Sequence, residues 1–344
     1  MHYPKDRGME KVYLSTVIPV YQGGPYLESL VEELLNVKSS LDHEESPLQL
    51  IEAIFVDDSS IDNSLEILSG LQAKHPWVRI LPLSRNFGQH PASVAGILHS
   101  SGDWVATLDE DLQHHPQFLI PLLMYAIANR QDVVYANPKE PVHNSLFRDL
   151  SSRLYKVLIS KLSNNPHVPY FNSFRMMRGN VARAAASVSS PTTYFDIALC
   201  WFTGRFGQLK LPLRDQRSGR RSGYNLGALV QHSWRMLVSS EIKVLKVAAI
   251  SGFAAVVVSL GAALYTLIQK LFYPEAVRLI GWASLIIVTF FFGGLLCFLL
   301  GIVLEFMSVL VLQAQGKPTF FVVDRTKDKL LSPLVEKYRQ SWSC

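Results

Sequence analysis

The strongest candidate for chemistry is the acidic run Asp109-Glu110-Asp111-Leu112-Gln113, which directly follows an apolar stretch typical of a strand. Two carboxylates two residues apart at a strand end can hold one hard divalent cation, and the amide oxygen of Gln113 can add a third ligand. Mg²⁺ and Mn²⁺ prefer such oxygen ligands and commonly keep phosphate oxygens in their other positions. An isolated Asp-x-Asp pair is usually a solvated turn. In this chain the acidic run follows a predicted strand, and we therefore expect Asp109, Asp111 and Gln113 to hold Mg²⁺ or Mn²⁺.

A second acidic pair, Asp57-Asp58, ends an earlier strand-like stretch. A carboxylate at this place can accept a hydrogen bond from a base N–H or a ribose hydroxyl, or it can cap a helix, a role for which Asp62 is also a candidate. The ends of neighbouring strands carry further polar or turn residues. These are Pro19, Tyr21, Arg85 and Asn86. Together with the acidic pair they predict a nucleotide pocket.

Alternating hydrophobic patterns predict the elements that bring these residues together. Strands are expected at 12–21, 50–60, 78–86 and 103–113, and helices at 25–41, 62–75 and 90–102. Strand–helix alternation with short connections is typical of an α/β fold, with a parallel sheet covered by helices on both faces. Ligands of such sheets bind at the carboxyl ends of the strands. Both acidic motifs fall at those ends.

Composition points away from an ordinary soluble enzyme. Hydrophobic residues make up 49% of the 344 residues and charged residues 18%, against about 25% charged in soluble domains. The net charge of +5 suits an anionic partner: nucleic acid, an anionic membrane or a phosphorylated substrate. Nucleic acid is disfavoured because the basic residues form no recognition motif. The three cysteines are widely spaced, which favours a reducing compartment.

Two charge-free stretches predict membrane-spanning helices. Between Lys246 and Lys270 lie 23 uncharged residues, and between Arg278 and Glu305 lie 26. A helix needs roughly 20 apolar residues to cross a bilayer, so spans are expected at 246–269 and 279–304. The short connector makes them a hairpin. The alternative is a pair of helices buried in a soluble core.

Basic residues outside the hairpin predict its orientation. They flank the spans on the side of both termini, which the positive-inside rule assigns to the cytoplasm. The N-terminus also lacks the apolar core of a signal peptide. The expected organisation is a cytosolic catalytic domain at 1–225, an interfacial amphipathic helix at 226–245, the two spans, and a juxtamembrane segment with a cytosolic tail at 305–344. The helix at 226–245 alternatively packs only on the catalytic domain.

Four segments carry a resemblance to a known family: IPVYQGG, FVDDSS, LSRNFGQHPASVAG and TLDEDLQHHP. In this order and spacing the chain resembles family 2 glycosyltransferases with a GT-A, Rossmann-like fold. More narrowly it resembles polyprenyl-phosphate glycosyltransferases, and its tail, with GKPTFFV, is similar to the bacterial membrane-anchored branch. The resemblance implies inverting, metal-dependent transfer of a sugar from a nucleotide-sugar, a UDP-sugar in bacterial relatives, to undecaprenyl phosphate. It also implies the cytoplasmic membrane face and a homo-oligomer such as a tetramer.

The resemblance also implies site roles. The nucleotide-binding set is Pro19, Tyr21, Asp57, Asp58, Arg85, Asn86, Asp109, Glu110, Arg217 and Arg220. Asp111 and Arg148 are catalytic, and Arg148, Ser173 and Arg175 hold the acceptor phosphate. Arg217, Arg220 and Arg221 belong to a mobile acceptor-side loop. Each Arg has an alternative, either a solvated helix face or attraction to lipid headgroups. The chain departs from the family at Gln22-Gly23, where Asn-Glu is common, and at Gly223, where Lys is usual.

Two other functions stay open. A membrane polysaccharide synthase would need a general base for a hydroxyl acceptor, and Asp196 is the one obvious candidate, although a helix cap or a surface acid is the more common role. A catalytically silent membrane scaffold is the other. Histidines near the motifs are expected to support the metal site (His114, His115) or to contact donor or acceptor (His90).

Overall fold

The computed structural model describes residues 11–42, 46–138, 166–190, 193–213, 281–314 and 318–323, with isolated positions between 257 and 272. The described residues up to 213 except Pro166, together with 318–323, belong to one compact unit, and the long helix α10 (Trp282–Ala314) belongs to a second. Several predictions lie outside the described residues. They are the roles of Arg148, Arg217, Arg220 and Arg221, the departure at Gly223, and the interfacial helix at 226–245.

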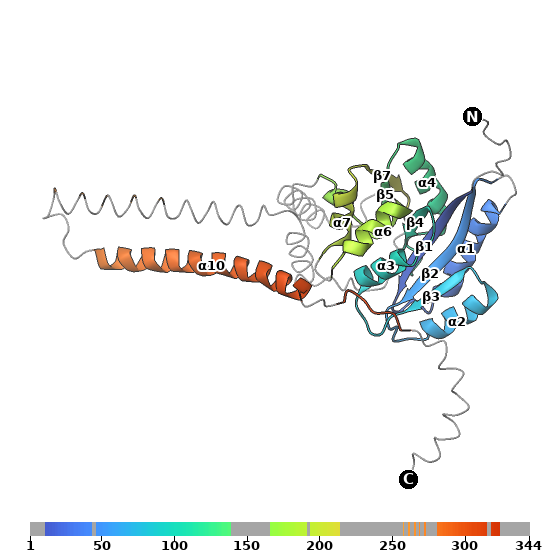
Figure 1. The fold of residues 1–344 in the computed structure, drawn as a ribbon, viewed down its shortest axis with the longest axis horizontal. Helices are drawn as coiled ribbons and strands as arrows, with labels where there is room; N and C mark the ends of the chain where they lie inside the picture. Colours follow the sequence, from blue (N-terminus) through green and yellow to red (C-terminus); the bar gives the residue numbers. More distant parts are fainter. Residues whose placement is uncertain are drawn as a thin grey trace, which may run out of the picture. The chain divides into compact units, whose positions relative to one another are not determined.

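The first unit is built on a seven-stranded sheet with the order β3-β2-β1-β4-β6-β5-β7 (Figure 1). Its strands are β1 (Val12–Val20), β2 (Leu48–Asp57), β3 (Val78–Pro82), β4 (Trp104–Thr107), β5 (Val133–Pro138), β6 (Arg175–Arg178) and β7 (Phe206–Leu211). All adjacent pairs are parallel except those of β6, which runs antiparallel to β4 and β5. The predicted α/β class is confirmed, and the antiparallel strand was not predicted.

Helices cover both faces of the sheet, as predicted (Figure 1). One hydrophobic cluster lies under α1 (Leu27–Leu41), α2 (Ser64–Lys74) and α4 (Leu119–Ala128), and the other under α3 (Gln89–Leu98), α6 (Gly179–Val188) and α7 (Phe195–Phe202). Alternate residues of β1 feed the two clusters, with Leu14 and Ile18 in one and Val17 in the other, because side chains of a strand point to opposite faces. Two short 3-10 turns, η1 (Pro116–Phe118) and η2 (Val168–Tyr170), complete the unit.

Close packing of α3 on the sheet depends on a glycine. A Cβ at Gly96 would lie 2.3 Å from Val17 Cγ1 and 2.9 Å from Val56 Cγ2, which is shorter than real carbon contacts. The bare backbone therefore lets α3 lie directly on β1 and β2. This fixes the start of α3 close to the carboxyl ends of these strands.

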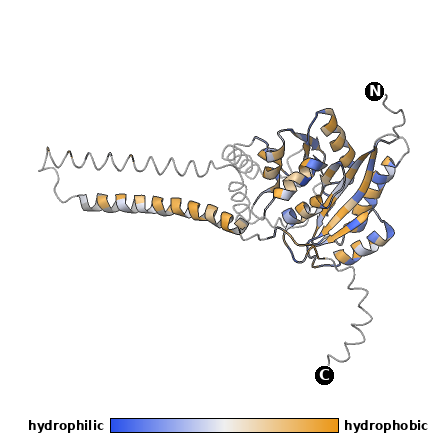
Figure 2. Ribbon diagram, viewed as in Figure 1, coloured by the Kyte–Doolittle hydropathy of each residue, from blue (hydrophilic) through white to orange (hydrophobic). Residues whose placement is uncertain are grey.

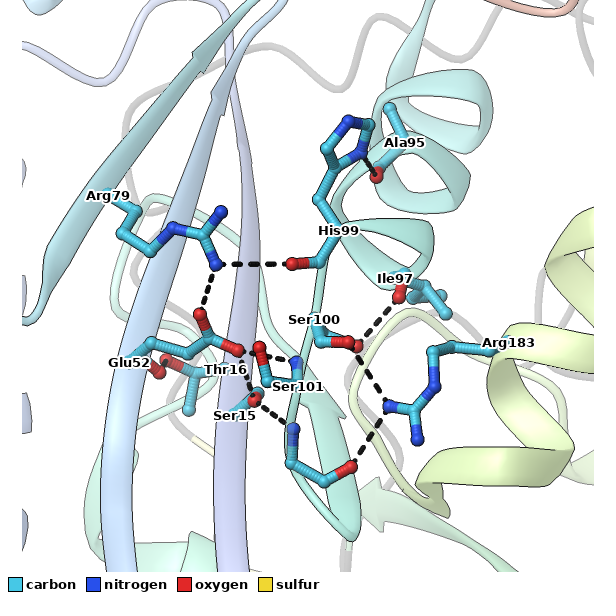
Figure 3. A network of polar contacts seen from close by, with 11 residues as sticks. Ser15, Thr16, Glu52, Arg79, Ala95, Ile97, His99, Ser100, Ser101 and Arg183 are labelled. Carbon is cyan, nitrogen blue, oxygen red and sulfur yellow. Dashed lines mark hydrogen bonds and ion pairs between the residues drawn. The ribbon is translucent and has the colours of Figure 1, made fainter.

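A buried polar network joins the sheet to the turn before β4 (Figure 3). Glu52, on β2 and 5% exposed, accepts hydrogen bonds from the Ser15 hydroxyl (2.7 Å) and the Ser101 N–H (2.6 Å), and it pairs with Arg79. From α6, Arg183 donates to two carbonyls of the same turn, at 3.0 and 3.2 Å. These contacts satisfy a carboxylate that would otherwise be costly to bury.

A short segment near the C-terminus adds a further strand-like edge. Val322 pairs antiparallel with Leu83, just after β3. The N–H of Val323 donates to the Pro82 carbonyl and the N–H of Ser84 donates to the Phe321 carbonyl, both at 3.0 Å. Residues 318–323, called the edge segment below, thus pair with the sheet although more than 230 residues separate them from β3.

The second unit contributes the helix α10, which is rich in hydrophobic residues (Figure 2). In the described part of the chain, no helix is long and apolar enough to cross a membrane. The first predicted span, 246–269, lies outside the described residues except at isolated positions, and the same holds for several side chains of α10. The two-span hairpin therefore stays a prediction.

Candidate active site

A cavity of about 340 Å³ opens at the carboxyl ends of the parallel strands. Its walls come from the loops that follow β1, β2, β3 and β4, and from the start of α3. The lining residues are Pro19, Val20, Tyr21, Asp58, Asn86, Gly88, Gln89, Asp109, Glu110 and Asp111. This is the edge at which parallel α/β sheets bind ligands.

Most of the predicted nucleotide and metal residues that the structure describes meet in this cavity. Pro19, Tyr21, Asp58, Asn86, Asp109, Glu110 and Asp111 line it. Three other described members of the predicted sets, Asp57, Arg85 and Gln113, are not among the lining residues. Arg85 instead lies over the Phe87 ring, 4.0 Å from its centroid. The roles of all these residues stay predictions.

Asp109 is held by side chains from two other elements. Its Oδ1 accepts from the Gln89 amide at 2.6 Å, and its Oδ2 accepts from the Ser173 hydroxyl at 3.1 Å. Its N–H donates to His114 Nδ1 at 3.1 Å, and the same ring nitrogen lies 3.5 Å from Asp109 Oδ2. His114 also stacks on Phe174, with ring centroids 4.9 Å apart. The supporting role predicted for His114 agrees with this geometry.

The turn that carries Asp111 uses an unusual backbone conformation. Leu112 has a φ of 59°, a left-handed conformation that is costly for a residue with a side chain. Its side chain packs against the core under α1, while Asp111 faces the cavity and accepts from the Gln113 N–H at 3.2 Å. Burial of Leu112 thus offsets the strain of the turn that presents the carboxylate.

Two of the three predicted metal ligands, Asp109 and Asp111, line the cavity and fit a hard divalent cation by their chemistry, whereas Gln113 is not among the lining residues. Asp109 and Asp111 supply carboxylate oxygens on one side of the cavity, and both oxygens of Asp109 keep lone pairs beyond their present hydrogen bonds. Among the residues that the structure describes, no group of three or more His, Cys, Asp or Glu side chains is arranged to hold a metal. The predicted set contains only two such side chains, with Gln113 as the third ligand.

Asp57 and Asp58 both support the loops around the cavity. Asp57 accepts from the N–H and hydroxyl of Ser60. The two oxygens of Asp58 accept from the N–H groups of Phe87 (2.7 Å) and Gly88 (2.8 Å). The pKa of Asp58 is raised above its usual value, chiefly by burial and also by the charge of Asp57, although these two bonds lower it. Through its bonds to Phe87 and Gly88, Asp58 joins the loop after β2 to the loop after β3. Its predicted contact with a nucleotide is a separate role.

The prediction that Asp62 caps a helix is off by one position, because Asn63 is the cap residue of α2, although Asp62 contacts the same helix start. It accepts from the N–H of Ser64, the first residue of α2, at 3.1 Å. The cap position itself is Asn63, whose side chain makes no capping bond.

The predicted roles of Arg175 and Asp196 are wrong, because both side chains are buried. Arg175 was expected to hold the acceptor phosphate, but it is 2% exposed and its guanidinium pairs with Asp196 and donates to the Thr107 hydroxyl. Asp196, the candidate base for a hydroxyl acceptor, is fully buried and also accepts from the Tyr135 hydroxyl at 2.7 Å. Neither side chain faces the cavity. Ser173, by contrast, lies beside Asp109.

Sequence reasoning missed Gln89, Val20 and Gly88, which also line the cavity. Gln89 lies within the segment LSRNFGQHPASVAG, so its position was flagged although its role was not. The next residue, His90, packs edge-on against Tyr194 with centroids 4.7 Å apart. Its contact with a donor or an acceptor stays a prediction.

A family model provides the decisive comparison. The model described as "Glycosyl transferase family 2" matches residues 15–184, a range that contains every described residue of the cavity. Residues 15–184 therefore carry a glycosyl transferase family 2 domain. The protein is a glycosyltransferase, and the match covers most of the α/β unit described above.

Relatives in the family match the chain over most of its length. An undecaprenyl-phosphate 4-deoxy-4-formamido-L-arabinose transferase of Edwardsiella ictaluri is 28% identical over 313 residues, covering 90% of this chain and 93% of that protein. An uncharacterized glycosyltransferase of Bacillus subtilis, YkcC, is 26% identical and covers 90% and 93%. Among solved structures, mannosyl-3-phosphoglycerate synthase from Rubrobacter xylanophilus has a TM-score of 0.47 at 16% identity, covering 66% of this chain and 72% of that one.

Proposed function

We propose that the protein transfers a sugar from a nucleotide-sugar to a polyprenyl phosphate, and that undecaprenyl phosphate is the acceptor and a UDP-sugar the donor. The observation that carries the proposal is the similarity, over 90% of the chain, to proteins named undecaprenyl-phosphate transferases. The acidic cavity at the strand ends supports it, because its carboxylates suit a divalent cation, and such a cation neutralises charge on a diphosphate. The sugar itself is not part of the proposal.

The chemistry follows from the charge of the acceptor. A phosphate oxygen is anionic at neutral pH, so no strong base is required, and the burial of Asp196 is compatible with this reaction. The oxygen forms a bond to the anomeric carbon as the bond from that carbon to the diphosphate breaks, which inverts the centre. Arg148 would hold the acceptor phosphate in line, with Ser173 beside the site.

Asp109, Asp111 and Gln113 would hold Mg²⁺ or Mn²⁺. When bound, such an ion neutralises charge on the leaving diphosphate. Gln89 and Ser173 orient the Asp109 carboxylate for this role through the hydrogen bonds described above.

Membrane attachment is part of the proposal. We expect a multi-pass protein of the cytoplasmic membrane, with the catalytic domain and both termini in the cytosol and a homo-oligomeric state. Support comes from the two charge-free stretches and from large apolar side chains exposed on α10, such as Leu296 (68%) and Phe298 (65%). An exposed apolar surface of this kind needs a cover, which a bilayer would supply.

The test is transfer from radiolabelled UDP- and GDP-sugars to undecaprenyl phosphate in detergent, with Mg²⁺ or Mn²⁺. We expect a labelled lipid that disappears in Asp111→Asn and persists in Asp42→Asn, which makes the same chemical change at the end of α1, outside the cavity. Donor hydrolysis without labelled lipid would refute the lipid acceptor and favour a hydroxyl acceptor. Failure to bind or turn over any donor would favour a silent scaffold.

A further inference from the structure

Glu110 lies between the two predicted metal ligands but its carboxylate is directed to another loop. Its Oε2 accepts from the N–H of Tyr21 at 2.9 Å, and its Oε1 accepts from the N–H of Gln22 at 3.3 Å. The two hydrogen bonds join the turn after β4 to the loop after β1, across nearly 90 residues of sequence. Both oxygens are thus engaged on the side of the cavity formed by Tyr21.

A glycine makes room for this contact. Gly23 is buried, and a Cβ at its position would lie 2.6 Å from Glu110 Oε2 and 3.1 Å from Cδ. A side chain at position 23 would therefore displace the carboxylate. The Glu110 carboxylate occupies the space that a side chain at position 23 would fill, so the two residues depend on each other.

The same loop is held from its other side. The N–H of Gly24 donates to Asp62 Oδ2 at 3.1 Å, and a Cβ at Gly24 would lie 2.6 Å from Asn63 Oδ1. The loop after β1 is therefore fixed between the acidic residues of two neighbouring loops. Glu110 provides the connection to the turn that carries Asp109 and Asp111.

We propose that Glu110 is a positioning residue, paired with Gly23, that fixes the Tyr21–Gly23 loop to the predicted metal-binding turn and so shapes the nucleotide side of the cavity. This role replaces the nucleotide contact predicted for Glu110 from the resemblance, because its carboxylate holds the loop and contacts neither metal nor nucleotide. The inference rests on the proposed function in one respect, that the ligand of the cavity is a nucleoside diphosphate.

The first experiment measures the loop without any ligand. Hydrogen exchange is followed in peptides that cover residues 19–26 of the full-length protein in detergent. In Glu110→Ala we expect the Tyr21 and Gln22 amides to exchange about tenfold faster or more, because their acceptors are removed. The matched control is Glu66→Ala, which removes an exposed Glu from α2 and leaves exchange unchanged. Unchanged exchange in Glu110→Ala, or an equal increase in the control, would overturn the proposal.

The second experiment separates nucleotide from metal. UDP and GDP binding is measured by calorimetry with Mg²⁺, and Mn²⁺ binding alone by paramagnetic resonance. Glu110→Ala should weaken binding of the preferred nucleotide about tenfold and lower the Mn²⁺ affinity by a smaller factor, because it removes a nearby negative charge but no oxygen that contacts the metal. A loss of Mn²⁺ affinity as large as the nucleotide loss would make Glu110 a metal ligand and refute the positioning role. A wild-type protein that binds neither nucleotide would refute the proposed function, and the exchange data would still decide the role of Glu110.

The third experiment tests the pairing with Gly23. Gly23→Ala should weaken nucleotide binding about as much as Glu110→Ala, because the new Cβ displaces the carboxylate. The double variant should be no weaker than Glu110→Ala alone, since no carboxylate remains to be displaced. Glu110→Gln keeps one acceptor oxygen and should fall between Glu110→Ala and wild type. Losses that simply multiply in the double variant would show that the two positions act independently.

Discussion

Asp109 shows how a single side chain in the cavity depends on residues from elsewhere in the fold. Its carboxylate accepts one hydrogen bond from α3, through Gln89, and one from the segment before β6, through Ser173. Ligands held in this way keep one orientation, and loss of such a supporting bond commonly costs 10–100-fold in metal affinity or activity.

Gln89→Ala should therefore lower the sugar-transfer rate by about tenfold to a hundredfold. The reason is that Asp109 loses its 2.6 Å partner and can rotate. The measurement is the initial rate at several Mg²⁺ concentrations, with Gln117→Ala, an exposed Gln of η1, as the control. A rate equal to wild type at limiting Mg²⁺ would contradict the orienting role.

The buried pair of Arg175 and Asp196 predicts a loss of stability. Asp196→Ala leaves an unpaired guanidinium in the core, and breaking a buried pair in this way costs about 3–5 kcal/mol. Denaturant unfolding of the purified protein measures it. Asp42→Ala breaks an exposed pair with Lys38 and should cost less than about 1 kcal/mol. Lost transfer in Asp196→Ala with unchanged stability would instead restore Asp196 as a base.

Among the elements, two sets of contacts stabilise the sheet. One lies outside the cavity, and the other lies at the edge of the sheet beside β3. One is the Glu52 network, which joins β1, β2, β3 and α6 to the turn before β4 (Figure 3). The other is the edge segment, which pairs with the end of β3 directly before the loop that carries Asn86. Each makes a prediction of its own.

The Glu52 network predicts a pH-dependent contribution to stability. Burial alone would raise the pKa of Glu52, but hydrogen bonds from Ser101 and Ser15 and the charge of Arg79 together bring it below the usual 4.5. A lowered pKa means that the ionised form stabilises the fold above pH 4.5 and that this stability is lost as the pH falls below it.

The Tm difference between wild type and Glu52→Gln should thus be large at about pH 7 and shrink at about pH 4. Thermal unfolding at both values measures the difference, and Glu66→Gln, at an exposed site, should show no such change. A difference that grows toward low pH would contradict the sign.

The edge segment predicts that a residue near the C-terminus stabilises the catalytic unit. Val323→Pro removes the N–H that donates to the Pro82 carbonyl, and we expect a loss of about 1–2 kcal/mol in the free energy of unfolding. Val323→Ala keeps the N–H and is the matched control. Equal stability of the two variants would show that this hydrogen bond contributes nothing.

At the scale of the whole molecule, α10 carries exposed apolar side chains, and its attachment to a membrane is proposed from them and from the sequence. Leu296→Arg places a charge near the middle of the second charge-free stretch. An arginine at the centre of a spanning helix costs about 2.5–3.5 kcal/mol, so the variant should be depleted from the membrane fraction after alkaline extraction. Leu296→Ala serves as the control. Full retention and activity of Leu296→Arg would contradict a membrane position for this residue.

Local patterns in the chain were enough to predict the strand–helix order and most of the residues that line the cavity. Apolar periodicity reports local structure, and the polar residues at strand ends follow directly because parallel strands share one edge. Tyr21, Asp58 and Asp109 were therefore predicted at the site before any contact was known. The family resemblance followed from the same segments.

The pairing of polar side chains, by contrast, could be seen only once segments distant in sequence were placed together in the fold. From the sequence, Arg175 is a plausible ligand of a phosphate. In the fold it lies on β6 with its side chain in the core, paired with Asp196, which is 21 residues away. The antiparallel β6, the edge segment on β3 and the contact of Glu110 with Gly23 likewise depend on pairing between distant segments. Hydrophobic periodicity carries no information about such pairing, because it reports which face of an element is buried and not against what.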